Sequence, residues 1–295
     1  MATAPDRLLR RLEWRLGRRL DGRLQGGYRT VWHGAGVDFS DLRTYLPEDD
    51  VRHIDWNVTA RLDEPFVRQY TEDRELTAWL VVDRSASMRF GGAAGKESVA
   101  TELAVSLARL ISQGGNRIGA ILYDNHAHRV VAPRSGRDQV LRIAHELLRP
   151  LPAPGPGATT DLAAMLTLAA ATTVRRRSLV IVLSDFIGDP GWERPLSRLT
   201  HRHEVVVIRV VDPAELDLPD LGLILVEDAE TGEQLLVDTS DPLLRGRLAD
   251  QVGARELAVA QSMRRAGVAA HQITTDQDLL AVLVGLVRDS GRVRR

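Results

Sequence analysis

The spacing of hydrophobic positions along the chain changes at residue 78. From there on, short apolar runs alternate with longer stretches in which apolar residues recur every three or four positions. A run of the first kind is typical of a buried strand, and a stretch of the second kind is typical of an amphipathic helix. Strands are predicted at 78–82, 118–123, 127–132, 178–183, 205–211 and 268–273, and helices at 96–113, 139–148, 161–174, 192–201, 243–266 and 279–287.

This order of elements predicts an α/β fold. Because strands and helices alternate, we expect a doubly wound, mainly parallel sheet covered by helices on both faces. The strands 118–123 and 127–132 are joined by a connection short enough for a hairpin, so one strand is expected to be antiparallel. Two further apolar runs, 223–226 and 234–237, flank an acidic turn and predict a second hairpin at an edge of the sheet.

The first 75 residues have a different character and are expected to precede a sheet domain at 76–295. Within 6–24, leucines and arginines interleave at helical spacing, which predicts a basic amphipathic helix. Such a helix can lie on a membrane surface or dock on a partner, or its leucine face can pack on its own domain. The leucines are Leu8, Leu9, Leu12, Leu16 and Leu20.

Residues 26–75 are dense in turn residues and charges, which predicts an irregular platform pinned by side chains. Residues 66–70 alternate in the manner of a strand. The charged side chains of the platform could pair with one another or form an exposed recognition surface. They are Arg43, Asp49, Asp50, Arg52 and Asp55.

Composition narrows the function classes. The chain has 295 residues, with 39 Lys and Arg against 40 Asp and Glu, so no charge excess points to nucleic acid. The absence of cysteine excludes disulfides, thiolate metal sites and a cysteine nucleophile. No apolar run approaches about 18 residues, so no transmembrane segment is predicted and the expected location is the cytoplasm. Lys96 is the only lysine, which we interpret as base-composition bias of the genome.

Candidate chemistry lies where two of the predicted strands end. Asp83, Ser85 and Ser87 follow the strand 78–82, and Asp185 follows the strand 178–183. Thr160 precedes a predicted helix. Because parallel strands end at the same edge of a sheet, these oxygen-bearing side chains are expected to meet there. Hard oxygen ligands suit a small divalent cation such as Mg²⁺. Alternatively, Asp83 caps the turn that follows it and the serines are ordinary loop residues.

The combination resembles the metal-ion-dependent adhesion site of von Willebrand factor type A domains. This resemblance implies the strand order 3-2-1-4-5-6, with the switch point between the Asp83 strand and the Asp185 strand. It also implies a bound Mg²⁺, or alternatively Mn²⁺ or Ca²⁺, that leaves one position open to an Asp or Glu of a partner. The implied metal ligands are Asp83, Ser85, Ser87, Thr160 and Asp185, with Thr159 as the reserve for Thr160.

The N-terminal segment also resembles the bacterial family catalogued as domain of unknown function 58, whose members are associated with MoxR-type AAA+ ATPases. The resemblance is carried by Gly34-x-Gly36-x-Asp38-Phe39 and by Arg43-x-Tyr45-x-Pro47-x-Asp49-Asp50-x-Arg52-x-Ile54-Asp55-Trp56. It implies a chaperone-like adaptor without enzymatic activity, which works with such an ATPase in the assembly or maturation of a client protein.

An enzyme is the alternative function. Asp83 and Asp185 with Mg²⁺ could support hydrolysis or phosphoryl transfer. However, Ser85 stands where aspartate-nucleophile phosphatases place their second Asp. Residues 91–98 imitate a phosphate-binding loop, but the glycine spacing is one residue short and Glu97 follows the lysine where Ser or Thr is needed. The remaining candidates for metal chemistry are two histidine pairs that we interpret as solvated surface features: His126 with His128, and His201 with His203.

Overall fold

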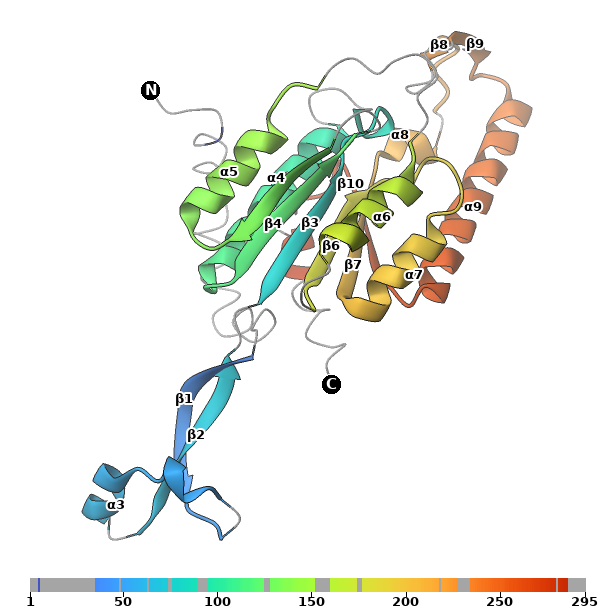
Figure 1. Cartoon of the computed structure of the whole chain (residues 1–295). Helices are drawn as coiled ribbons and strands as arrows, with labels where there is room; N and C mark the ends of the chain where they lie inside the picture. Colours follow the sequence, from blue (N-terminus) through green and yellow to red (C-terminus); the bar gives the residue numbers. More distant parts are fainter. Residues whose placement is uncertain are drawn as a thin grey trace.

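The central feature of the computed structural model is a six-stranded sheet (Figure 1). The structure describes residue 5 and residues 35–47, 49–62, 64–73, 76–89, 95–124, 128–151, 160–173, 177–217, 219–227, 234–279 and 281–285. The amphipathic helix expected at 6–24, the platform residues before 35 and the reserve ligand Thr159 lie outside these ranges. Among the described residues, no helix combines the length and the apolar composition that a bilayer crossing requires.

The sheet has the predicted doubly wound topology. Its strand order is β10-β7-β6-β3-β4-β5, in which β5 alone runs antiparallel to its neighbour and the other neighbours are parallel. Numbered along the chain, this is the order 3-2-1-4-5-6, with the switch point between β3 and β6 as expected. The strands are β3 (Thr77–Asp83), β4 (Arg117–Tyr123), β5 (His128–Arg134), β6 (Leu179–Ser184), β7 (Glu204–Val211) and β10 (Ala269–Thr274).

Helices cover both faces of the sheet because every central strand is apolar on both sides. In β3, Leu80 and Val82 belong to the core that packs on α4 and α5, whereas Trp79 and Val81 belong to the core under α6, α7 and α9. α4 begins and ends where the sequence predicts it. The helices are α4 (Lys96–Gln113), α5 (Arg137–Leu147), α6 (Leu162–Thr172), α7 (Glu193–Arg202), the short α8 (Pro213–Leu216) and α9 (Pro242–Arg265).

The segment before the sheet is more regular than expected. β1 (Ala35–Thr44) and β2 (Phe66–Asp73) form an antiparallel ribbon that projects away from the sheet in Figure 1. The connection between these strands contains the short 3-10 helix η1 (Val51–His53) and α3 (Trp56–Leu62). Several large apolar side chains are exposed in this connection: Leu46, Val51, Trp56 and Leu62.

The charged residues of the platform divide between two roles. Arg43 binds Asp49 through two hydrogen bonds of 2.7 and 2.5 Å, so at least this part of the expected ion-pair network forms. Asp50 accepts a hydrogen bond from the Arg52 N–H, and Asp55 accepts bonds from two N–H groups at the start of α3. These two carboxylates therefore cap helical turns.

The second predicted hairpin forms, but its expected place at an edge of the main sheet is wrong. β8 (Leu223–Glu227) and β9 (Gln234–Asp238) pair with each other as a separate two-stranded sheet between α8 and α9. Both edges of the main sheet belong to other strands, β5 and β10. As a result, several leucines of the hairpin remain exposed.

Candidate functional site

Polar side chains meet at the carboxyl ends of β3 and β6, the two strands that flank the switch point. Asp83 is the last residue of β3, and Ser184 is the last residue of β6. The strands pair in parallel up to Val82 and Leu183, so these two polar residues emerge side by side. This edge is where open α/β sheets bind their ligands.

Asp83 is held from both sides. Its Oδ1 accepts a hydrogen bond of 2.9 Å from the Ser85 N–H, and its Oδ2 accepts one of 2.7 Å from the Ser184 hydroxyl. The hydroxyls of Ser85 and Ser87 lie 3.1 Å apart, and all of these side chains are buried. Asp83 thus makes the turn contact that its capping role predicts, and it also brings the Asp-x-Ser-x-Ser oxygens into one cluster.

The surroundings of Asp83 disfavour the ionised form of its carboxyl group. Burial raises the pKa of its carboxyl group, and the nearby carboxylate of Asp185 raises it further, to about 6. The hydrogen bonds from Ser184 and Ser85 act in the opposite direction because they favour the ionised form. A cation placed between the two carboxylates would relieve this repulsion.

Asp185 has a side chain that is fixed by its own loop. Its Oδ1 accepts a hydrogen bond of 2.9 Å from the Ile187 N–H. Between them, Phe186 adopts a positive φ of 57°, which is unusual for a residue with a bulky side chain. The ring of Phe186 packs edge-on against Trp192 with a centroid distance of 5.0 Å, which holds this conformation in place.

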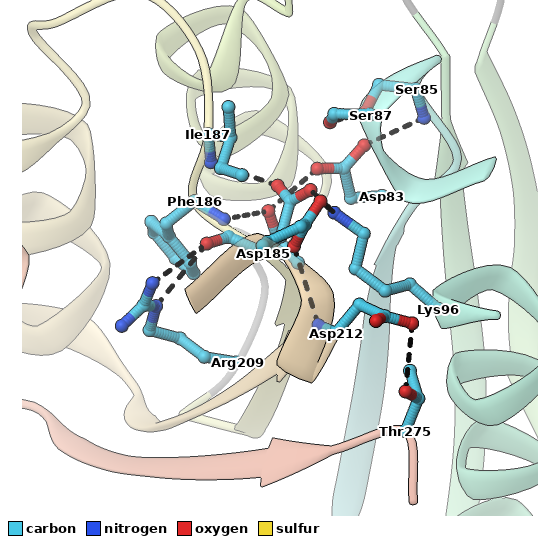
Figure 2. A network of polar contacts seen from close by, with 12 residues as sticks. Asp83, Ser85, Ser87, Lys96, Asp185, Phe186, Ile187, Arg209, Asp212 and Thr275 are labelled. Atoms are coloured by element: carbon cyan, nitrogen blue, oxygen red, sulfur yellow. Dashed lines mark hydrogen bonds and ion pairs between the residues drawn. The ribbon is translucent and has the colours of Figure 1, made fainter. Parts of the chain in front are cut away.

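The main chain of Asp185 is anchored from the next strand. Arg209 in β7 donates to the Asp185 carbonyl through Nε and Nη2, at 3.3 Å each (Figure 2). The Arg209 guanidinium is itself held by Glu256 of α9 through bonds of 2.7 and 2.9 Å. These bonds lower the pKa of Glu256, so the carboxylate stays charged and keeps the arginine in position.

Lys96 is a further residue of the site that the sequence patterns do not predict. Its Nζ donates to Asp185 Oδ2 at 2.7 Å and to Glu215 Oε1 at 2.5 Å, and the side chain is completely buried. In Figure 2 the side chains of Asp83, Asp185 and Lys96 point toward one another. The signal was present, because Lys96 is the only lysine of the chain, but it was interpreted as compositional bias.

Thr160 lies against the loop that follows Asp185. Its side chain is completely buried, and its carbonyl accepts a hydrogen bond of 3.2 Å from the Asp189 N–H. At Gly188, a Cβ atom would lie only 2.4 Å from the same carbonyl oxygen. The loop that contains Thr160 therefore packs directly on the loop that follows Asp185. Ligation by the Thr160 hydroxyl stays a prediction.

The donor set of the site fits a hard divalent cation in its chemistry. Carboxylates and hydroxyls are the only side-chain groups that the predicted ligands offer, and Mg²⁺, Mn²⁺ and Ca²⁺ all favour oxygen. Within the described ranges, no group of three or more His, Cys, Asp or Glu side chains could hold a metal ion. A metal site built largely from hydroxyls would be consistent with this result.

The interpretation of His203 as a solvated residue is wrong. His203 is buried, its Nδ1 accepts a hydrogen bond of 3.2 Å from the Ser178 N–H, and its Nε2 lies 3.1 Å from the Thr173 hydroxyl. The side chain links the ends of α6, β6 and α7, so its role is structural. His128 and His201 are exposed, as predicted.

Comparison with known proteins identifies relatives along most of the chain. A family model described as "Protein of unknown function DUF58" matches residues 41–257. An uncharacterized protein of Mycobacterium tuberculosis, Rv1480, is 39% identical over 288 residues, which cover 96% of this chain and 89% of the relative.

Solved structures with a similar arrangement share little sequence with this chain. An aerotolerance-related membrane protein from Bacteroides fragilis matches with a TM-score of 0.48 and 14% identity, over 74% of this chain and 99% of that chain. A von Willebrand factor type A protein from Catenulispora acidiphila matches with a TM-score of 0.41 and 15% identity, over 75% of this chain and 43% of that chain.

Proposed function

This chain belongs to the DUF58 family, and we propose that it is a protein-interaction module that binds a partner through a divalent cation at the carboxyl ends of β3 and β6. The observation that carries the proposal is the cluster of buried oxygens that Asp83, Ser85 and Ser87 form next to the carboxylate of Asp185 at the switch point. Burying carboxylates and hydroxyls costs free energy unless a cation or hydrogen bonds compensate for their lost hydration.

The residues that would hold the ion are those of the Asp-x-Ser-x-Ser turn together with Asp185 and Thr160. Mg²⁺ is the expected ion, with Mn²⁺ or Ca²⁺ as alternatives. When bound, the ion would supply a Lewis-acidic position to which an Asp or Glu of the partner can bind. Because hydroxyls contribute no charge, two carboxylates just neutralise a divalent ion and leave it attractive to a third carboxylate.

The proposed role is binding and not catalysis. Both carboxylate oxygens of Asp83 accept hydrogen bonds, and Asp185 is paired with the ammonium group of Lys96. A hydrogen-bonded carboxylate can still serve as a metal ligand, so these contacts are compatible with the binding role. The hydrolase or phosphoryl-transfer alternative would require one of the two carboxylates to act as a nucleophile or base instead.

The partners follow from the family resemblance. A MoxR-type AAA+ ATPase would act with this protein in the cytoplasm on the assembly or maturation of a client, and the client or the ATPase would offer the carboxylate. The exposed Trp56 and the other exposed apolar residues of the connection between β1 and β2 are a candidate second contact surface, because large exposed apolar groups mark interaction sites.

The test is a pull-down of partners by the full chain in Mg²⁺ and in EDTA, with Asp83→Asn as the site variant. The control is Asp138→Asn, which removes an exposed carboxylate in the first turn of α5. This helix follows the antiparallel strand β5, so it begins at the amino ends of the parallel strands, away from the candidate site. Partner capture should require Mg²⁺ and should be lost in Asp83→Asn only. Capture that is indifferent to EDTA, or phosphatase or ATPase activity that Asp83→Asn abolishes, would overturn the proposal.

A further inference from the structure

Lys96 occupies a position that is unfavourable for an ammonium group. Its side chain is completely buried, so the charge has lost its hydration. It is also the first residue of the 18-residue helix α4, whose N-terminal end carries a partial positive charge. A cation in such a place needs specific partners to offset these costs.

Two carboxylates that follow other strands of the sheet pair with this ammonium group. Asp185 follows β6, and Glu215 lies in α8 after β7, whereas Lys96 itself begins the helix that follows β3. The strands β3, β6 and β7 are neighbours in the sheet. The ammonium group therefore joins the segments that leave three adjacent strands, at the edge where Asp83 lies (Figure 2).

The charges of this cluster do not balance. Asp83, Asp185 and Glu215 contribute three carboxylates against the single ammonium of Lys96. When all three carboxylates are ionised, the cluster has a net charge of minus two. One divalent cation would neutralise this charge. At the same time, the ammonium group shares Asp185 with any ion bound there and repels it.

We propose that Lys96 is an internal counter-cation that competes with the divalent ion for Asp185 and so sets the affinity of the site for that ion. This inference rests on the cation-dependent binding proposed above. Glu215 gives the ammonium group a second carboxylate, which it retains when Asp185 turns to the ion. Lys96 therefore offsets one of the three carboxylate charges in the absence of metal, and Glu215 makes exchange with the metal reversible.

The experiment measures Mn²⁺ binding to the full chain by isothermal titration calorimetry and by electron paramagnetic resonance. Lys96→Met should tighten the dissociation constant by on the order of tenfold, the effect of removing one close like charge. Glu215→Gln should weaken it several-fold, because the ammonium group is then left to Asp185 alone. The matched control is Arg137→Met, which also removes one positive charge. Arg137 is the first residue of α5 and lies at the amino ends of the parallel strands, away from the candidate site.

The two proposals fail in different ways. If the wild type and Lys96→Met both bind no Mn²⁺ while circular dichroism reports a native fold, the metal site itself is refuted. If the wild type binds Mn²⁺ and Asp83→Asn does not, but Lys96→Met binds equally or more weakly, the metal site stands and the competition is refuted. If Lys96→Met does not fold, Glu215→Gln decides, because unchanged or tighter binding in that variant contradicts the competition.

Discussion

The hydroxyl of Ser184 donates a hydrogen bond of 2.7 Å to Asp83 Oδ2, which ties the end of β6 to the end of β3 across the switch point. The same hydroxyl accepts a bond of 3.0 Å from the Phe186 N–H, at the start of the loop that positions Asp185. Ser184 is completely buried, so these two hydrogen bonds are shielded from solvent. One side chain therefore positions both Asp83 and the loop that contains Asp185.

Ser184→Ala should destabilise the protein by about 1–3 kcal/mol, because it leaves a buried carboxylate oxygen and a buried N–H without their partner. Urea unfolding measures this. Ser106→Ala is the control, since Ser106 is equally buried but its hydroxyl donates to the Glu102 carbonyl within α4. That bond contributes little in a helix, so the control should change stability by about 0.5 kcal/mol or less. Equal losses in the two variants would contradict the role of Ser184.

Gly188→Ala should separate the two loops of the candidate site. The new Cβ would lie 2.4 Å from the Thr160 carbonyl oxygen, a backbone atom that cannot move away alone. We expect a loss of about 1–3 kcal/mol in the free energy of unfolding, as for other overpacked positions. If Thr160 is a metal ligand, Mn²⁺ affinity should fall as well, which calorimetry measures.

Gly246→Ala is the opposite case and serves as its control. Gly246 lies inside α9 with nothing within 4 Å of the position of a Cβ atom. Alanine there should stabilise the protein by about 0.5–1 kcal/mol, because glycine is a poor helix former. A destabilised Gly246→Ala would show that α9 makes contacts that its exposure does not suggest.

The sheet could be predicted from the sequence because each strand is recognisable from the apolar residues of its own segment. The strands β3, β4 and β6 contain continuous apolar runs, and α4 shows its buried face through Leu103, Leu107 and Leu110 at helical spacing. The Asp-x-Ser-x-Ser turn and Asp185 could also be placed at one edge, because parallel strands end together.

The rest of the site could not be predicted because its partners are distant in sequence. The bonds from Lys96 to Asp185 and Glu215 span 89 and 119 residues, and neither is marked by periodicity. Burial of His203 depends in the same way on Thr173 and Ser178, which lie on other elements. Two apolar runs that predict a hairpin likewise do not specify which sheet it joins, so β8 and β9 were misplaced.

The exposed leucines of the β8–β9 hairpin should contribute little to stability. Leu225 faces Leu236 across the two strands, and each is 61% exposed. Leu225→Ala is therefore expected to change the free energy of unfolding by less than about 0.5 kcal/mol, whereas Leu103→Ala in the core of α4 should cost about 2–5 kcal/mol. Urea unfolding of both variants measures the difference. A large loss in Leu225→Ala would mean that another surface covers the hairpin in solution.

His203 should make the fold sensitive to acid. Burial lowers the pKa of His203 below its usual 6.5, and the positive charges of Arg202 and Arg177 lower it further. The unfolded chain therefore binds a proton at this residue at a higher pH than the folded chain does. By linkage, the contribution of His203 to stability is present above about pH 6.5 and is lost as the pH falls below that value.

His203→Gln isolates this effect, because glutamine can keep hydrogen bonds to Ser178 and Thr173 but does not titrate. Urea unfolding between pH 7.5 and pH 5 should show a shallower loss of stability in the variant than in the wild type. The raised pKa of Asp83 acts in the opposite direction, since its folded form holds a proton more tightly, but it is common to both proteins and cancels in the comparison. Identical pH profiles would mean that His203 binds its proton equally well in the folded and the unfolded chain, which would contradict the lowered pKa of the buried side chain.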